Sequence, residues 1–315
     1  MIQAVVLDRS ALFCYTVFIL ISKENDMINL YNPKEVRDLM SAHGITFRKE
    51  FGQNFLMDPF IVEEIADAAG DTSDRTVLEI GPGVGTLTRE LAARYRRVLA
   101  LEIDRGLIPV LSETLADCPN VEVLNLDAMK ADLKELFAKD FAEGPVSVCA
   151  NLPYYITTPI LMKLLECGLP FDSITVMVQK EVADRLCAKA GSKDYGAITA
   201  AVAYYGSAAK RFGVPAGKFL PPPKVDSAVV RIDLYKTSPY KDADRDLLFR
   251  TIKAAFGERR KTLSNALSSG FPELSKDAIV ASISSVGLEP SVRGERLDIE
   301  AFVTLSGALQ KVLKE

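Results

Sequence analysis

Histidine is almost absent from this chain of 315 residues, since His43 is the only one. A single imidazole argues against a metal site built from histidines and against a serine–histidine catalytic triad. Cysteine is present, but its five copies are scattered and none forms a Cys-x-x-Cys pair. An odd, scattered set predicts neither a disulfide framework nor a zinc site, and it is typical of reduced thiols in a cytoplasmic protein.

An excess of positive charge is also missing, because the formal net charge is −4 at pH 7. Any surface that binds nucleic acid must therefore be a local patch of basic residues. Hydrophobic residues make up 48% of the chain and charged residues 25%, which is the composition of an ordinary globular protein. The length allows one large core and a smaller second one.

An apolar run at residues 11–22 is too short to span a membrane, which takes about 20 residues. Asp8 and Arg9 precede it, and no small-x-small cleavage site of a signal peptide follows. We therefore expect residues 1–26 to be an extension outside the folded protein, and we expect no membrane association. A secreted or membrane-anchored protein is the alternative.

Short apolar segments alternate with helix-length segments through the middle of the chain. The strands expected from these apolar segments are residues 77–80, 98–103, 121–126, 146–150 and 174–178. Because parallel strands need crossover connections, the alternation predicts a parallel α/β sheet with right-handed crossovers. A further strand at 225–234 follows three prolines at 221–223, which favour a stiff, extended approach.

Helices are expected around this sheet and again after it. Those around the sheet are residues 34–43, 59–69, 86–94, 107–115, 130–141 and 159–167. Beyond residue 236 the strand signal ends, and helix-length segments follow at 246–255, 262–267, 275–286 and 299–313. We therefore predict a sheet-containing domain at 27–238 and a small helical domain at 239–315.

A glycine-rich segment, the glycine loop (residues 81–85), follows directly after the first expected strand. Glycine permits a sharp turn and lets a ligand approach the backbone. The amide groups of the helix that follows point toward the same space. Ligands of open parallel sheets bind at this edge, so Gly81 and Gly83 predict a nucleotide-type cofactor site. A tight turn without a ligand is the alternative.

Acidic residues after the next two strands complete the predicted cofactor site. Glu102 can accept hydrogen bonds from both hydroxyls of a ribose, with Asp104 as the neighbouring alternative, and Asp127 can accept from an adenine amine. The Gly-x-Gly-x-Gly spacing differs from the usual NAD fingerprint, and the acidic Glu79 before the loop would sit poorly beside a pyrophosphate. Both features favour S-adenosylmethionine, which carries a cationic sulfonium and no phosphate.

The segment Asn-Leu-Pro-Tyr at residues 151–154, the NLPY corner, follows the fourth expected strand. The exocyclic amine of adenine is a poor nucleophile, so a catalyst helps by accepting its hydrogens and aligning it with a methyl donor. The Asn151 side chain and the Leu152 backbone carbonyl can accept, and Tyr154 can stack on the base. The corner therefore predicts methyl transfer to an unpaired or flipped-out adenine, without a metal or a strong base. A strand-end turn with a packed tyrosine is the alternative.

Five ordered motifs make the chain resemble the rRNA adenine dimethyltransferase family, most closely its bacterial small-subunit branch, over about residues 45–305. They are FGQNFL at 51–56, the segment 79–85, Asp-Ala-Met at 127–129, the NLPY corner, and FLPPPKVDS at 219–227. The resemblance implies an α/β fold with a Rossmann-like class I methyltransferase sheet, mostly parallel and seven-stranded, and a small C-terminal all-helical domain. Residues 1–26 have no counterpart in the family.

The resemblance also implies a reaction. Methyl groups pass from S-adenosylmethionine, which becomes S-adenosylhomocysteine, to two adjacent adenosines in a hairpin loop near the 3′ end of 16S rRNA. The implied partner is the 30S subunit or its precursor. The scattered cysteines and the lack of metal ligands lead us to expect a cytoplasmic protein without a metal, and its oligomeric state is open, with a monomer as the default.

Site residues are implied in the same way. The cofactor-contacting residues are Gln53, Asn54, Leu56, Gly81, Gly83, Glu102, Asp127 and Asn151. Phe219 corresponds to a second aromatic residue that packs on the target base opposite Tyr154.

Basic residues outnumber acidic ones by six to two in residues 245–265. A charge cluster is more often a solvated face, but the resemblance favours a surface that contacts rRNA phosphates. The predicted RNA-binding residues are Arg48, Lys49, Arg250, Lys253, Arg259, Arg260 and Lys261.

Other functions remain open from the sequence. One is a 23S rRNA adenine methylase of the antibiotic-resistance type, and another is a non-catalytic ribosome-assembly factor with the same fold. The FLPPPKVDS string favours the small-subunit branch, and the intact NLPY corner with Glu102 argues against lost catalysis. An NAD oxidoreductase is disfavoured by the loop spacing.

Overall fold

The computed structural model describes residues 28–48, 52–70, 72–138, 144–258 and 260–314. Its centre is a seven-stranded sheet with the strand order β4-β3-β2-β5-β6-β9-β7. These strands are β2 (Thr72–Ile80), β3 (Tyr95–Leu101), β4 (Val121–Leu124), β5 (Val146–Asn151), β6 (Phe171–Gln179), β7 (Gly206–Val214) and β9 (Ser227–Leu234). The pairs from β4 to β6 are parallel, whereas β9 runs antiparallel to both β6 and β7. The predicted mostly parallel sheet is confirmed.

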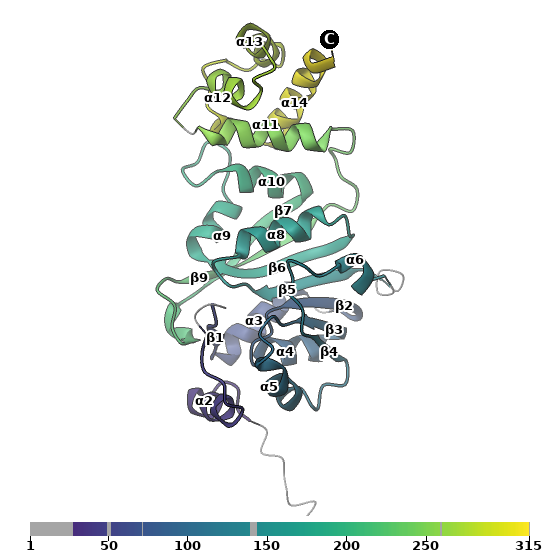
Figure 1. Ribbon diagram of the computed structural model, residues 1–315, viewed down its shortest axis with the longest axis vertical. Helices are drawn as coiled ribbons and strands as arrows, with labels where there is room; N and C mark the ends of the chain where they lie inside the picture. Colours follow the sequence, from purple (N-terminus) through teal and green to yellow (C-terminus); the bar gives the residue numbers. More distant parts are fainter. Residues whose placement is uncertain (1–27, 49–51, 71, 139–143, 259, 315) are drawn as a thin grey trace, which may run out of the picture.

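Helices cover both faces of the sheet (Figure 1). They are α2 (Pro33–Ala42), α3 (Pro59–Ala69), α4 (Thr86–Arg94), α5 (Leu107–Thr114), α6 (Leu133–Leu136), α8 (Thr157–Glu166), α9 (Lys180–Leu186) and α10 (Ala197–Tyr205). Apolar side chains of α3 and α4 pack on one face, against residues such as Val77 and Val98. Those of α6, α8, α9 and α10 pack on the other face, against residues such as Leu78 and Leu99. Consecutive residues of one strand, such as Val77 and Leu78, thus contribute their side chains to opposite faces of the sheet, as the pleat of a strand requires.

Two short strands join distant motifs of the sequence. β1 (Phe55–Leu56) pairs antiparallel with β8 (Phe219–Leu220), so that Leu56 lies opposite Phe219. Next to β1, the Asp58 side chain accepts hydrogen bonds from the amides of Phe60 and Ile61 at 3.1 and 3.2 Å and begins α3. This cap, with proline at the first helical position, is the helix start that the sequence predicts. The FGQNFL motif is therefore held by the pairing of β1 with β8 and by the capped start of α3.

The helical region after the sheet comprises α11 (Arg245–Gly257), α12 (Leu263–Gly270), α13 (Lys276–Ser285) and α14 (Ile299–Lys314). Its buried core does not stop at the predicted boundary, because Tyr195, just before α10, and Ala200 of α10 belong to it. The Tyr195 hydroxyl also donates a 2.7 Å hydrogen bond to the Leu297 carbonyl. Figure 1 shows α10 between the sheet and α11. The helical region is thus packed onto the sheet domain through α10.

Several elements differ from the sequence-based expectation. β7, α9 and α10 were not expected. α6 is the short helix Leu133–Leu136, whereas a helix was predicted at 130–141, of which residues 139–141 lie outside the described residues. β7 is an edge strand whose side chains are mostly exposed, so its sequence carries no apolar run. The extension predicted at residues 1–26 lies outside the described residues. Within the described ranges, no helix has the length and apolarity that crossing a membrane requires.

The start of β7 provides a test of how tightly the sheet packs. A Cβ added at Gly206 would lie 2.3 Å from the Asp233 carbonyl oxygen of β9. The φ of −177° suits any residue, so the obstacle is space alone. We expect Gly206→Ala to lower the free energy of unfolding by about 1–3 kcal/mol in urea denaturation.

The matched control is Gly307→Ala, at an exposed position in α14 where an added Cβ meets nothing within 4 Å. It should raise the free energy of unfolding by up to about 1 kcal/mol, because alanine favours helix more than glycine does. Equal effects of the two substitutions would contradict the packing described at β7 and β9.

Candidate active site

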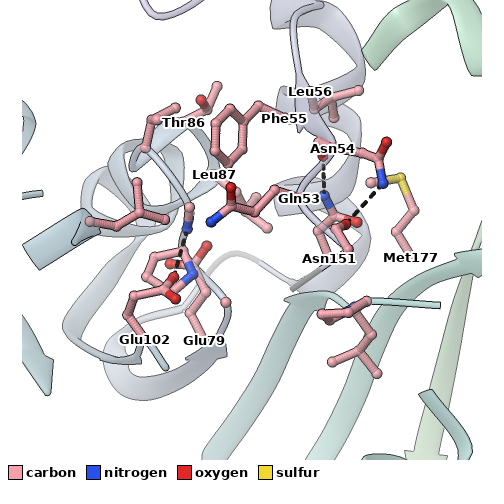
Figure 2. A pocket seen from close by; sticks show the side chains of 18 of the residues that line it. Gln53, Asn54, Phe55, Leu56, Glu79, Thr86, Leu87, Glu102, Asn151 and Met177 are labelled. Atoms are coloured by element: carbon pink, nitrogen blue, oxygen red, sulfur yellow. Dashed lines mark hydrogen bonds between the residues drawn. The ribbon is translucent and has the colours of Figure 1, made fainter. Parts of the chain in front are cut away.

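A pocket lies at the carboxyl ends of β2, β3 and β5, where the glycine loop, Glu102 and the NLPY corner meet (Figure 2). The parallel pairing puts these strand ends at one edge of the sheet. Residues 52–56, just before α3, form another wall of the pocket. Three of the five motifs of the sequence thus line one pocket, and the topology of a parallel sheet predicts this place for the two that follow its strands, the glycine loop and the NLPY corner.

The glycine loop has a backbone that only glycine adopts readily. Gly81 and Gly83 have φ of 74° and 63°. A Cβ at Gly83 would also lie 3.0 Å from the Phe55 ring, so the loop and the β1 segment are in close contact. The Gly81 amide donates to the Leu101 carbonyl at 2.9 Å, which fixes the loop to the end of β3. The glycines therefore serve the local geometry and leave backbone facing the pocket.

Glu102 lies at the end of β3 and is only 4% exposed. One carboxylate oxygen accepts from the Asp104 amide at 2.7 Å, and the other accepts from the Gly83 amide at 3.3 Å. Burial raises the pKa of Glu102 to about 7, although these two backbone bonds oppose the shift. The predicted ribose acceptor thus lines the pocket and is tied to the glycine loop.

Asp104, the alternative to Glu102, has a different role. Its carboxylate is 1% exposed and accepts from the Gln53 side-chain amide at 2.9 Å, the Gly106 amide at 3.0 Å and the Arg48 guanidinium at 3.3 Å. It does not line the pocket. Asp104 therefore anchors the segment on the N-terminal side of β1, which the sequence did not reveal.

Asn151 connects the NLPY corner to that same segment. Its amide nitrogen donates to the Asn54 carbonyl at 3.3 Å, and the Asn54 side chain donates to the Gly52 carbonyl at 2.9 Å (Figure 2). Among the described residues no donor reaches the Asn151 side-chain oxygen or the Leu152 carbonyl. Both predicted acceptors are thus available to a ligand in the pocket.

The two aromatic residues predicted to hold the base differ in placement. Tyr154 lines the pocket, is half-buried, and has its hydroxyl 2.7 Å from the Ser227 hydroxyl. Phe219 is 5% exposed, lies opposite Leu56 in the β1–β8 pair, and packs in the core rather than in the pocket wall. Its role as a second stacking ring stays a prediction.

Asp127 follows β4, next to β3 in the sheet, but it is not part of the pocket wall. Its carboxylate accepts from the Met129 amide at 2.9 Å. Lys163 of α8 donates to the carbonyls of Met129 and Ala131, both at 2.8 Å, and so holds the turn after β4. Lys163 had no signal in the sequence, because a lysine on an amphipathic helix usually faces solvent.

Glu79 is the most deeply buried ionisable group in the pocket wall. It is 1% exposed, and one of its carboxylate oxygens has no hydrogen-bond partner, nor has the buried Thr86 hydroxyl beside the loop. Burial, more than the nearby Glu102, raises the pKa of Glu79 to about 8. Unpaired buried polar atoms that face a pocket point to a bound group. Among the described residues that line the pocket none is a lysine, arginine or histidine, and a lining with two carboxyl groups fits the cationic S-adenosylmethionine that the sequence predicts.

Apolar residues of the pocket were missed by sequence reasoning. Ile103 is 46% exposed and lines the pocket, where it offers apolar surface to a flat ring. Ile65, Leu87 and Met177 reach the pocket from α3, α4 and β6. Only tertiary packing brings them there. Within the described residues, no group of histidine, cysteine, aspartate and glutamate could hold a metal ion.

The predicted RNA-binding residues lie in different environments. Lys253, Arg260 and Lys261 are exposed, at or after α11. Arg250 is engaged within the helical region, where it donates to the Gly270 carbonyl at 2.8 Å and its guanidinium carbon lies 4.2 Å from the centre of the Phe271 ring. Arg48 is held by Asp104. Lys49 and Arg259 lie outside the described residues.

Known proteins share both sequence and fold with this chain. The family model described as ribosomal RNA adenine dimethylase matches residues 44–311. A protein of Alkaliphilus metalliredigens named ribosomal RNA small subunit methyltransferase A is 47% identical over 89% of this chain and 98% of its own length. A protein of Geobacillus thermodenitrificans with the same name is 44% identical over 91% and 99%.

Two solved structures resemble the fold. A dimethyladenosine transferase from Plasmodium falciparum has a TM-score of 0.70 and 26% identity, and the match covers 81% of this chain and 97% of that one. The 23S rRNA methyltransferase ErmE has a TM-score of 0.63 and 28% identity over 82% and 100%.

The buried Glu79 predicts a pH dependence of stability. Its pKa rises from an ordinary 4.5 to about 8 on folding, so folding favours the protonated carboxyl. This contribution is fully present below about pH 4.5 and is lost as the pH rises through 8. The free energy of unfolding of Glu79→Gln, taken relative to that of the unmodified protein, should therefore rise from pH 5 to pH 8.5 by on the order of a few kcal/mol.

Urea denaturation at both pH values measures this difference. Glu64→Gln, at an exposed position of α3, is the control. Its free energy of unfolding relative to the unmodified protein should be nearly the same at the two pH values. A parallel response of the Glu79 and Glu64 variants would refute a strongly shifted pKa at Glu79.

Proposed function

This chain belongs to the ribosomal RNA adenine dimethylase family, and on that premise we propose that it methylates small-subunit rRNA. Membership implies S-adenosylmethionine as the methyl donor. The proposed acceptors are the N6 amines of two adjacent adenosines in a hairpin loop near the 3′ end of 16S rRNA. The proposed partner is the 30S subunit or its precursor, and the enzyme acts as a cytoplasmic monomer.

The glycine loop and the NLPY corner meet at one pocket, and this convergence is the main support for the proposal. Glu102, Gly83 and the backbone near Asn54 would hold the nucleoside part of the cofactor. Glu79, with an unpaired carboxylate oxygen, suits the positively charged end. S-adenosylmethionine supplies an electrophilic methyl group on sulfur when it is bound.

The NLPY corner would position the adenine amine. With its nitrogen held by the Asn54 carbonyl, Asn151 presents its oxygen to one N6 hydrogen, and the Leu152 carbonyl accepts the other. Two acceptors draw electron density toward N6 and direct its lone pair at the methyl carbon. Transfer would form the nitrogen–carbon bond and break the carbon–sulfur bond, and the N6 proton that is lost would pass to water. The half-buried Tyr154 ring would offer a face to the base.

We prefer 16S rRNA to 23S rRNA because the relatives with close to half of their residues identical carry the small-subunit name. The 23S enzyme ErmE shares 28% of its residues, although its fold is also similar. A non-catalytic assembly factor is disfavoured by the available acceptors at Asn151 and Leu152, which a purely structural corner would not need.

Removal of the Asn151 side chain tests the catalytic role. We expect Asn151→Ala to lower the methylation rate about 10²–10³-fold, a typical loss when one group that stabilises the transition state is removed. Labelled S-adenosylmethionine is incubated with unmethylated 30S subunits, and dimethyladenosine is measured by nucleoside analysis.

The control is Asn29→Ala, an exposed asparagine ahead of α2, which should keep full activity. Near-normal turnover of Asn151→Ala would contradict the proposed positioning. Dimethyladenosine formed only on 50S subunits or 23S rRNA would move the proposal to the 23S class, and none on either substrate would refute the enzyme function.

The exposed cations after α11 are proposed to bind rRNA phosphates. We expect Arg260→Glu with Lys261→Glu to weaken 30S binding about tenfold or more and to reduce its salt dependence, because each neutralised phosphate releases counterions. Affinity for S-adenosylhomocysteine should be unchanged. Binding is followed by filter retention over a range of salt concentrations.

A matched double reversal, Lys311→Glu with Lys314→Glu, changes the same charge on the last turns of α14. It should affect 30S binding less. Equal weakening by both pairs would indicate a general charge effect and would count against a local RNA-binding patch.

A further inference from the structure

Tyr155 directly follows the NLPY corner, yet its side chain is 59% exposed. Among the described residues it takes part in no hydrogen bond, ion pair or ring contact. Its neighbour Tyr154 behaves differently, because the Tyr154 hydroxyl bonds to Ser227 and the ring lines the pocket. Two consecutive tyrosines thus divide into one that is fixed in the pocket and one that is turned toward solvent.

The Tyr155 ring lies at the rim of the pocket. A Cβ built on Gly52 would lie 3.2 Å from the Pro153 side chain and 3.5 Å from two ring carbons of Tyr155. Gly52, Pro153 and Tyr154 all line the pocket. With φ of 62° and no side chain, Gly52 lets the ring rest against the backbone of the opposite wall.

The backbone that carries Tyr155 is held on its C-terminal side. The Pro153 carbonyl accepts from the Ile156 amide at 3.2 Å and from the Thr157 hydroxyl at 3.1 Å. These two bonds close a turn around Tyr155 and join it to the start of α8. An exposed aromatic ring on a fixed turn loses little freedom when a ligand packs against it.

A ligand for this ring follows from the proposed substrate. An adenine that enters the pocket leaves the base stack, and the nucleotide beside it loses a stacking partner. An exposed aromatic ring at the pocket rim can replace that partner, at about 1–3 kcal/mol per base and with little dependence on base identity. We propose that Tyr155 is a stacking platform for the unpaired nucleotide that adjoins the target adenosine.

This inference rests on the proposed RNA substrate, so it is tested on the full-length enzyme with unmethylated 30S subunits. Tyr155→Ala should raise KM for the subunits about 5- to 150-fold, which corresponds to the loss of one stacked base. It should leave kcat within a few-fold and affinity for S-adenosylhomocysteine unchanged. Tyr155→Phe should behave like the unmodified enzyme, because stacking needs the ring and not the hydroxyl.

The control is Tyr235→Ala, which removes another exposed tyrosine, 41% accessible, directly after β9. It should leave KM unchanged. An unchanged KM for Tyr155→Ala would refute the platform, and so would a loss shared equally by Tyr155→Ala and Tyr155→Phe, which would assign the effect to the hydroxyl. A parallel loss of cofactor affinity would also overturn it, because Tyr155 would then only support the Gly52 wall.

These outcomes are separate from a failure of the proposed function. If the unmodified enzyme forms dimethyladenosine on 30S subunits while Tyr155→Ala keeps its KM, only the stacking platform is wrong. If the unmodified enzyme forms none, the proposed substrate is wrong, and the proposed role of Tyr155 is refuted as well.

Discussion

One side-chain hydrogen bond, from the Asn151 amide to the Asn54 carbonyl, joins the two walls of the pocket. Asn151 comes from the end of β5, and Asn54 comes from the segment before β1. An asparagine side chain has one donor end and one acceptor end, so fixing the nitrogen determines where the oxygen points. The orientation of the proposed acceptor for adenine therefore depends on a segment almost a hundred residues earlier in the chain, and that segment is held in turn by Asp104.

Two buried carboxyl groups give the pocket its chemical character. Burial raises the pKa of both Glu79 and Glu102, so each is more readily protonated than an ordinary glutamate. A cation in the pocket favours the charged form instead, because an opposite charge at short range lowers a carboxyl pKa. Binding of a sulfonium and ionisation of Glu79 should therefore support each other. The product thioether would lack the sulfonium charge, so this attraction would be weaker for the product than for the methyl donor.

Much of the fold and the chemistry could be predicted from the sequence, because both lie in local patterns. The buried strands carry continuous apolar runs, and the glycine loop and NLPY corner follow them directly. Edge strand β7 could not be recognised, since its exposed side chains leave no pattern. The roles of Asp104 and Lys163 could not be seen either, because each depends on a partner from another element. Phe219 matched a family motif, yet pairing of β8 with β1 puts its ring in the core.

The packing of α10 fixes the position of the helical region relative to the pocket. The helical region shares its buried core with α10, and the Tyr195–Leu297 hydrogen bond crosses between them. α10 also packs on the sheet through Val202. A basic surface after α11 is therefore fixed relative to the pocket by buried apolar contacts, not by a flexible linker. The proposed phosphate contacts on the helical region would then set the position of a nucleotide at the NLPY corner, since phosphate contacts fix register without reading sequence.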